Sequence, residues 1–166
     1  MLLIKEQELF LPANEGAVLA GTPMDLGYFA AVEGLGDGDS PKVDFSRKLP
    51  ADFISLISVK ALWMSPAAAG NMYWQLRARY CAAGQMYTTH SDAPALGVTA
   101  TVGAWLFNLS EPANPLTLTD LAVGDFFGVQ FYREGSDALD TLNDVVDFLG
   151  LLFTYRARAS KEGWPP

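Results

Sequence analysis

The most regular pattern in the chain is an alternation of apolar and polar side chains over residues 72–80, which read MYWQLRARY. Trp74 and Leu76 fall on one side of an extended chain, whereas Arg77 and Arg79 fall on the other. Successive side chains of a strand point to opposite faces of a sheet. The segment therefore predicts an antiparallel strand with one buried face and one face turned to solvent or to a partner.

Similar segments recur along the chain and are separated by breaks rich in proline and glycine, such as Pro50 after residues 42–49. Proline donates no backbone hydrogen bond, so it marks the end of a strand. No helical segments alternate with the strands. This order favours an all-β sandwich of two antiparallel sheets, of the jelly-roll kind, with seven or eight strands. The expected strands cover residues 2–11, 42–49, 53–63, 72–80, 98–109, 116–119, 127–131 and 145–155.

One segment departs from the strand pattern. Leu139 and Leu142 begin a series of apolar residues at helical spacing, which Ser136 or Asp137 could cap. The aromatic residues and glycines that follow suit a strand better than the end of a helix. We therefore expect at most a short helical turn near residues 137–142.

The chain has 166 residues, which is enough for one well-buried core. We expect a β-sandwich domain at residues 41–158. Residues 1–40 are expected to form a strand followed by an arm or long loop, because residues 34–40 read GLGDGDS. Residues 159–166 are expected to form a C-terminal tail.

The 19 acidic residues outnumber the 11 basic ones, and the net charge is −8. This balance repels phosphate backbones and anionic membranes, so neither nucleic acid nor a membrane is expected as a partner. Lys5, Glu6 and Glu8 interrupt the first apolar run, and we expect no signal peptide. No later run approaches the ~20 apolar residues of a membrane helix.

Cys81 is the only cysteine and His90 is the only histidine. An intramolecular disulfide is therefore impossible, and a zinc site would lack ligands. We interpret Cys81 as an inert buried thiol and His90 as an exposed loop residue. No nucleophile motif or phosphate-binding loop is recognisable, so the sequence predicts no enzyme activity, no cofactor and no catalytic or metal-binding residues.

Two features keep a carbohydrate-binding jelly-roll module open as the alternative function. Acidic loops at residues 37–39 and 137–147 could hold a structural calcium, although solvated turns are the simpler interpretation. Trp63, Trp74 and Trp105 could form a sugar-binding surface, but all three lie in apolar strand segments, which favours packing in the core. A hydrolase on a sandwich scaffold is the weakest alternative.

Two stretches of the sequence carry a resemblance to a known family. Residues 49–53 read LPADF and precede a strand ending at Trp63 and then the MYWQLRARY strand. Residues 121–142 read LAVGDFFGVQFYREGSDALDTL and precede a strand finishing at Tyr155. In this order the stretches resemble jelly-roll virion structural proteins, of the capsid, decoration or fibre-base type, from phages and related environmental viruses.

The resemblance implies a non-enzymatic structural protein of a virus particle that acts by self-association and docking. Such a protein would form a homo-oligomer, above all a trimer, and would bind other virion proteins. It would be made in the host cytoplasm and reside in the virion. Within the second stretch, Asp137 and Asp140 could brace Arg133 across a loop, as a structural rather than a catalytic bridge.

Overall fold

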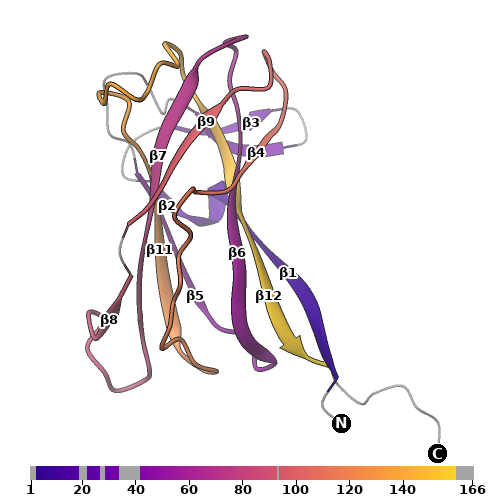
Figure 1. The fold of residues 1–166 in the computed structure, drawn as a ribbon, viewed down its shortest axis with the longest axis vertical. Coiled ribbons are helices and arrows are strands. Elements are labelled where there is room, and N and C mark those ends of the chain that lie inside the picture. Colours follow the sequence, from indigo (N-terminus) through magenta and orange to yellow (C-terminus); the bar gives the residue numbers. More distant parts are fainter. Residues whose placement is uncertain (1–2, 19–21, 27–28, 34–41, 93, 160–166) are drawn as a thin grey trace, which may run out of the picture.

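The computed structural model describes residues 3–18, 22–26, 29–33, 42–92 and 94–159. These residues form twelve strands and one short 3-10 turn, arranged as two six-stranded antiparallel sheets (Figure 1). The arrangement confirms the predicted two-sheet antiparallel sandwich. Three of the strands have only two or three residues. The seven or eight expected strands did not include the five-residue strands β3 (Thr22–Leu26) and β4 (Phe29–Glu33). No helix in this part of the chain is long or apolar enough to cross a membrane.

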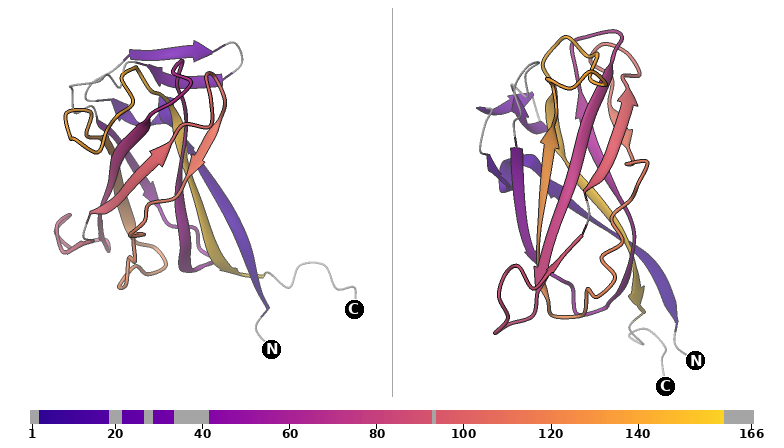
Figure 2. Two further views of the ribbon diagram at one scale, coloured as in Figure 1. Left: turned by 45° about the horizontal axis from the view of Figure 1, so that its top comes forward. Right: turned by 60° about the vertical axis from the view of Figure 1, so that its left-hand side comes forward.

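Sheet A has the strand order β10-β6-β12-β4-β3, and β1 also pairs with β12. The strand predicted near the N-terminus is present as β1 and lies against β12 along nine residue pairs (Figure 2). It thus completes the chain's own sheet. The strands of sheet A are β1 (Ile4–Pro12), β3 (Thr22–Leu26), β4 (Phe29–Glu33), β6 (Phe53–Met64), β10 (Asn108–Ser110) and β12 (Asp147–Arg158).

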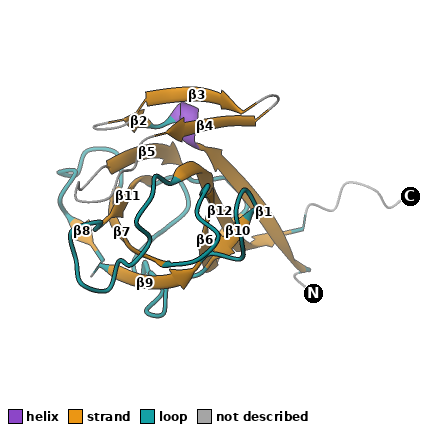
Figure 3. Ribbon diagram, turned by 90° about the horizontal axis from the view of Figure 1, so that it is seen from above, coloured by secondary structure: helices purple, strands orange, loops and turns teal. Residues whose placement is uncertain are grey.

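Sheet B has the order β2-β5-β11-β7-β8, with β9 also pairing with β7. Seen along the strands, β5, β11, β7 and β9 lie on one side of the molecule and β6, β12 and β1 on the other (Figure 3). A 3-10 turn, Ala13–Glu15, follows β1. The strands of sheet B are β2 (Ala17–Val18), β5 (Lys42–Lys48), β7 (Asn71–Cys81), β8 (His90–Ser91), β9 (Ala95–Ala100) and β11 (Phe126–Arg133).

Aromatic rings from β11 and β12 join the two sheets in the core. Phe131 stacks on Phe148 with ring centroids 4.0 Å apart. Phe127 meets Phe153 edge to face, with centroids 5.4 Å apart. All four side chains are buried. Such pairs add about 0.5–1.5 kcal/mol beyond the apolar area they bury, so they help to fix how the sheets pack.

Trp63 and Trp74 are fully buried, as predicted for core residues. Each indole N–H has an acceptor: Trp63 Nε1 donates to Ser110 Oγ at 2.9 Å, and Trp74 Nε1 donates to Thr99 Oγ1 at 3.1 Å. A buried N–H without an acceptor would be destabilising, so these hydroxyls allow the tryptophans to lie in the core. Trp105 differs, because it is 56% exposed.

The strand predicted for residues 98–109 is interrupted. β9 ends at Ala100 and β10 begins at Asn108, and the residues between them form a loop that carries Trp105. Trp105 has a φ of 59°, a left-handed conformation that does not fit a strand. The strand predicted for residues 116–119 is also absent, and Leu118 in that segment has a φ of 45°.

The segment after β11 forms turns, in agreement with the expectation of at most a short helical turn near residues 137–142. The Asp137 N–H donates to Glu134 O at 3.0 Å, and the Asp140 N–H donates to Asp137 O at 2.9 Å. Each bond closes a single turn, and no helix forms across these residues. The leucines at helical spacing thus belong to a folded loop.

The expected division into residues 1–40, 41–158 and 159–166 stays a prediction. The glycine-rich stretch at residues 34–40 lies outside the described residues, and so do residues 160–166, which include Trp164.

Gly97 of β9 provides space for a buried tryptophan. It pairs with Trp74 of β7, and a Cβ at position 97 would lie 2.4 Å from Trp74 Cε2. The Gly97→Ala substitution must displace the indole, so we expect it to lower the free energy of unfolding by about 1–3 kcal/mol in chemical denaturation. Gly128→Ala in β11 is the matched control, because a Cβ there meets no atom closer than 3.7 Å. Equal losses in the two variants would contradict the prediction.

Candidate functional site

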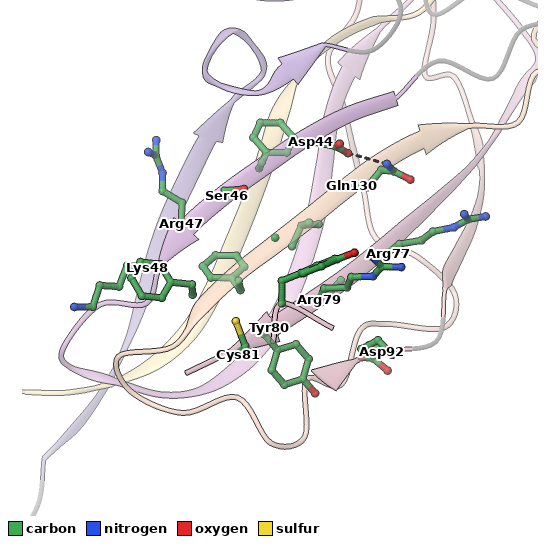
Figure 4. Close-up of a pocket in the computed structure, with 18 of the residues that line it drawn as sticks. Asp44, Ser46, Arg47, Lys48, Arg77, Arg79, Tyr80, Cys81, Asp92 and Gln130 are labelled. Atoms are coloured by element: carbon green, nitrogen blue, oxygen red, sulfur yellow. Dashed lines mark hydrogen bonds between the residues drawn. The ribbon is translucent and has the colours of Figure 1, made fainter. Parts of the chain in front are cut away.

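A groove of about 770 Å³ crosses the outward face of sheet B (Figure 4). Its floor is formed by β5, β11 and β7, which lie side by side in antiparallel register. The register aligns their outward side chains in three rows, and successive rows are roughly 7 Å apart because each is two residues further along β11. The rows are Lys48–Phe126–Cys81, Ser46–Gly128–Arg79 and Asp44–Gln130–Arg77.

The groove is open at its centre and has aromatic rings at its margin. Gly128 occupies the middle row and has no side chain to fill the space above the sheet. Phe126 is 50% exposed, and Tyr87, from the loop between β7 and β8, is 69% exposed. Two large rings thus line the groove, each with a cation near one face: Lys48 Nζ lies 5.8 Å from the centroid of Phe126, and Arg79 Cζ lies 5.6 Å from that of Tyr87.

The groove has the opposite charge to the chain as a whole. Four basic and two acidic side chains line it, which gives a local charge of +2 against −8 for the full sequence. Figure 4 shows Arg47 and Lys48 of β5 on one side and Arg77 and Arg79 of β7 on the other. Basic side chains therefore lie along both margins of the groove.

Three of these four cations have no acidic partner in the part of the chain that the structure describes. Arg47 pairs with Glu15 of the 3-10 turn. Among the described residues, no carboxylate lies within ion-pair distance of Lys48, Arg77 or Arg79. All three side chains are exposed, so their charges are available to a ligand.

Aromatic rings hold the two arginines. Arg77 Cζ lies 5.3 Å from the centroid of the Tyr132 ring, and Arg77 Nη2 donates to Gln75 Oε1 at 3.2 Å. Arg79 Cζ lies 5.6 Å from the centroid of the Tyr87 ring. A guanidinium resting on a ring is restrained while most of its N–H donors stay free. Both arginines are therefore partly ordered before any ligand binds.

The two carboxylates in the groove already accept hydrogen bonds from the protein. Asp44 Oδ1 accepts from Gln130 Nε2 at 2.8 Å, along the row that also contains Arg77. Asp92 Oδ2 accepts from the backbone N–H groups of Thr117 and Leu118 at 2.5 and 3.0 Å. Asp92 thus holds the loop after β10 against the wall of the groove.

Two residues that the sequence marked are placed differently from their predictions. Cys81 was expected to be buried, but it is half-buried and lines the groove at the end of β7. His90 was expected in an exposed loop, but it is half-buried in β8, where its ring stacks on Tyr80 at 5.3 Å and its Nδ1 lies 3.8 Å from Asp120 Oδ2. Burial raises the pKa of the Tyr80 hydroxyl above its ordinary value.

The residues proposed as a loop bridge lie away from the groove. Arg133 is fully buried, and its Nε and Nη2 donate to Asp140 Oδ2 and Oδ1 at 3.0 and 2.8 Å. Asp137 is exposed on the same loop, and its Oδ1 accepts from the Leu139 N–H at 2.8 Å. The structure therefore brings Arg133 and Asp140 together, while Asp137 braces only its own turn.

The acidic loops do not form a metal site in the described part of the chain. No group of three or more His, Cys, Asp or Glu side chains there is placed to hold a metal ion. Asp140 is engaged by Arg133, and Asp144 Oδ1 accepts from the Val145 N–H at 2.8 Å. The other acidic loop, at residues 37–39, lies outside the described residues.

No protein-family model matches the chain, and no curated protein matches it. Solved structures do share its fold. The carbohydrate-binding module CBM36 in complex with calcium and xylotriose has a TM-score of 0.52 and 13% identity, over 87% of this chain and 98% of the module. The CBM36-1 domain of a multidomain xylanase from the hindgut metagenome of Trinervitermes trinervoides has a TM-score of 0.50 and 11% identity, over 89% of this chain and 96% of that domain.

A larger protein contains the same fold as one part. The isomalto-dextranase of Arthrobacter globiformis T6, complexed with panose, has a TM-score of 0.56 and 16% identity over 88% of this chain. The chain spans 23% of that protein.

These comparisons overturn the resemblance to virion structural proteins. The chain shares its fold with carbohydrate-binding modules and with part of an isomalto-dextranase. The predictions of a homo-oligomer, above all a trimer, and of virion proteins as partners were therefore wrong. The quoted motifs consist of strand alternation and turn residues, which antiparallel sandwiches of unrelated function share. They therefore identified the architecture but could not separate one family from another.

Proposed function

We propose that this chain is a non-catalytic carbohydrate-binding module that holds an oligosaccharide in the groove of sheet B. The observation that carries the proposal is the groove itself, in which the exposed rings of Phe126 and Tyr87 stand beside a row of hydrogen-bonding side chains. The shared fold supports it, because two of the similar structures are carbohydrate-binding modules and one was solved with xylotriose.

The chemistry of the groove suits a sugar chain. The C–H faces of a sugar ring are apolar and can lie on an aromatic ring, whereas its hydroxyls need donors and acceptors in the plane of the ring. Phe126 and Tyr87 supply the rings, while Asp44, Gln130 and Ser46 supply the polar atoms. The open position at Gly128 lets the ligand approach the sheet between them.

The proposed recognition does not use calcium. One of the similar modules was solved with calcium as well as xylotriose. In this chain the two carboxylates of the groove, Asp44 and Asp92, are each engaged by protein donors, and the described residues contain no cluster suited to a metal. Calcium needs about six to eight oxygen ligands around one ion, and two carboxylates that are already hydrogen-bonded to the protein do not fit such a site.

The same carboxylates argue for binding without catalysis. Glycoside hydrolysis needs one carboxyl group that donates a proton and a second that acts as a base or nucleophile. Asp44 and Asp92 instead accept hydrogen bonds from an amide side chain and from backbone N–H groups. We expect a bound oligosaccharide to stay intact, with no release of reducing ends during prolonged incubation.

A glycan array followed by titration calorimetry tests the proposed function. We expect the wild-type chain to bind at least one class of oligosaccharide. Phe126→Ala and Tyr87→Ala should each weaken that binding about five- to tenfold, because each removes a ring contact of roughly 1 kcal/mol. Both side chains are at least half exposed, so their loss should leave the fold intact.

Trp105→Ala is the matched control, since Trp105 is also exposed but does not line the groove. We expect its affinity to equal that of the wild type. Loss of binding in Trp105→Ala, with normal binding in both groove variants, would move the site to the loop between β9 and β10. An array without any glycan ligand would overturn the function altogether.

A further inference from the structure

We infer that the groove selects glycans that carry uronate carboxylates. This inference rests on the proposed function and names the class of sugar that the groove recognises. It is motivated by the cluster of basic side chains on β5 and β7 in a chain whose net charge is −8. A neutral sugar would gain little from such a cluster.

The positions of the cations fit an acidic sugar chain along the groove. Arg79 and Arg77 occupy successive rows of β7, roughly 7 Å apart, and Lys48 lies in the row beyond Arg79 on the opposite side. A carboxylate on a bound sugar would therefore meet a cation in each row. Because no described carboxylate pairs with these three side chains, binding needs no internal ion pair to break.

The two arginines are suited to carboxylates in particular. A guanidinium presents two parallel N–H donors that match the two oxygens of a carboxylate. Tyr132 and Tyr87 contact Arg77 and Arg79, with ring centroids 5.3 and 5.6 Å from the two Cζ atoms. Because the two arginines are already restrained, they lose less side-chain entropy on binding a carboxylate than freely moving arginines would.

The groove fits a glycan better than a nucleic acid strand. Asp44 and Asp92 lie among the cations and would repel closely spaced phosphates, whereas carboxylate oxygens can accept hydrogen bonds from sugar hydroxyls. The net charge of −8 adds a general repulsion of polyanions. A ligand with many hydroxyls and interspersed carboxylates satisfies both kinds of side chain.

The test compares matched ligands that differ only in charge. Each acidic oligosaccharide of an array, including glucuronate-substituted xylo-oligosaccharides, oligogalacturonates and oligomannuronates, is paired with its carboxyl-reduced form. We expect the acidic member of the preferred pair to bind at least tenfold more tightly, a difference of about 1.4 kcal/mol. Raising NaCl from about 0.05 to about 0.5 M should remove most of this preference, because exposed charges are screened.

Arg77→Gln and Arg79→Gln should each lower the affinity for the acidic member more than the affinity for the reduced member, so that the preference for the acidic member becomes smaller. Arg156→Gln on β12 is the matched control, because it removes the same charge from an exposed strand position outside the groove. We expect the control to keep the wild-type preference.

The outcomes separate the inference from the function on which it rests. Equal affinity for both members of every bound pair would overturn the inference and leave carbohydrate binding in place. Binding to no glycan at all would overturn both. Equally tight binding of a single-stranded oligonucleotide, with the same dependence on Arg77 and Arg79, would show a general polyanion site and would also overturn the inference.

Discussion

The Asp140→Asn substitution is expected to lower the free energy of unfolding by about 3–5 kcal/mol, because it removes the carboxylate that pairs with the buried guanidinium of Arg133. Arg133 is fully buried, and two of its nitrogens donate to the Asp140 carboxylate at 2.8 and 3.0 Å. The same carboxylate accepts from the backbone N–H of Tyr73 at 3.0 Å, so it also ties the loop to β7. Chemical denaturation of the variant measures the loss directly.

Asp137→Asn is the control from the same loop. Asp137 is exposed, and among the described residues its carboxylate accepts one hydrogen bond, from the Leu139 N–H, a role that an amide oxygen can fill. We expect its effect to stay within about 0.5 kcal/mol. A double variant of Arg133→Met with Asp140→Asn should cost less than the two single losses added together, because the buried charge that Asp140 binds is removed as well. Strict additivity would mean that the ion pair is not the cause.

The Gly150→Ala substitution is expected to be nearly as damaging, because position 150 has no room for a Cβ. A Cβ there would lie 2.3 Å from the carbonyl oxygen of Leu11 in β1, and the backbone φ is 151°. We expect about 1–3 kcal/mol from the backbone conformation and about 1–3 kcal/mol from the clash. Denaturation measures the sum, and hydrogen exchange should show faster opening of β1 amides.

Gly124→Ala separates the two contributions to this loss. Gly124 has a φ of 91°, but a Cβ there meets no atom within 4 Å, so only the backbone contribution remains. We expect a smaller loss than for Gly150→Ala and unchanged exchange in β1. If the two variants lost equal stability, the clash between position 150 of β12 and Leu11 of β1 would not explain the loss in Gly150→Ala.

Much of the sandwich could be predicted because alternation is a local property. Residues 72–80 carry the pattern of β7 within one stretch, and burial of Trp74 and Leu76 follows from it. Trp105 could not be assigned in the same way, since its apolar neighbours look like a strand and only the tertiary structure gives it a left-handed backbone. Local apolar character does not distinguish a strand from an exposed apolar loop.

Only part of the groove could be predicted from the sequence. The outward arginines of β7 were recognised as facing solvent or a partner, but the side chains opposite them come from β5 and β11, up to about fifty residues away in the chain. Register between distant strands decides that Gly128 lies beside Arg79 and that Gln130 lies beside Asp44. A single sequence contains no direct signal for such pairing, so the site could be assembled only from the structure.

The pairing of β1 with β12 has a mechanical consequence. Ile4 lies opposite Arg158 at the outer end of the pair, and Pro12 lies opposite Gly150 at the inner end. A pulling force applied across these two outer residues would load the backbone hydrogen bonds one after another, as in a zipper, and not all together in shear. Tension between flanking attachments would therefore peel β1 from β12 first, on the sheet opposite the groove, before it reached the three strands that form the groove.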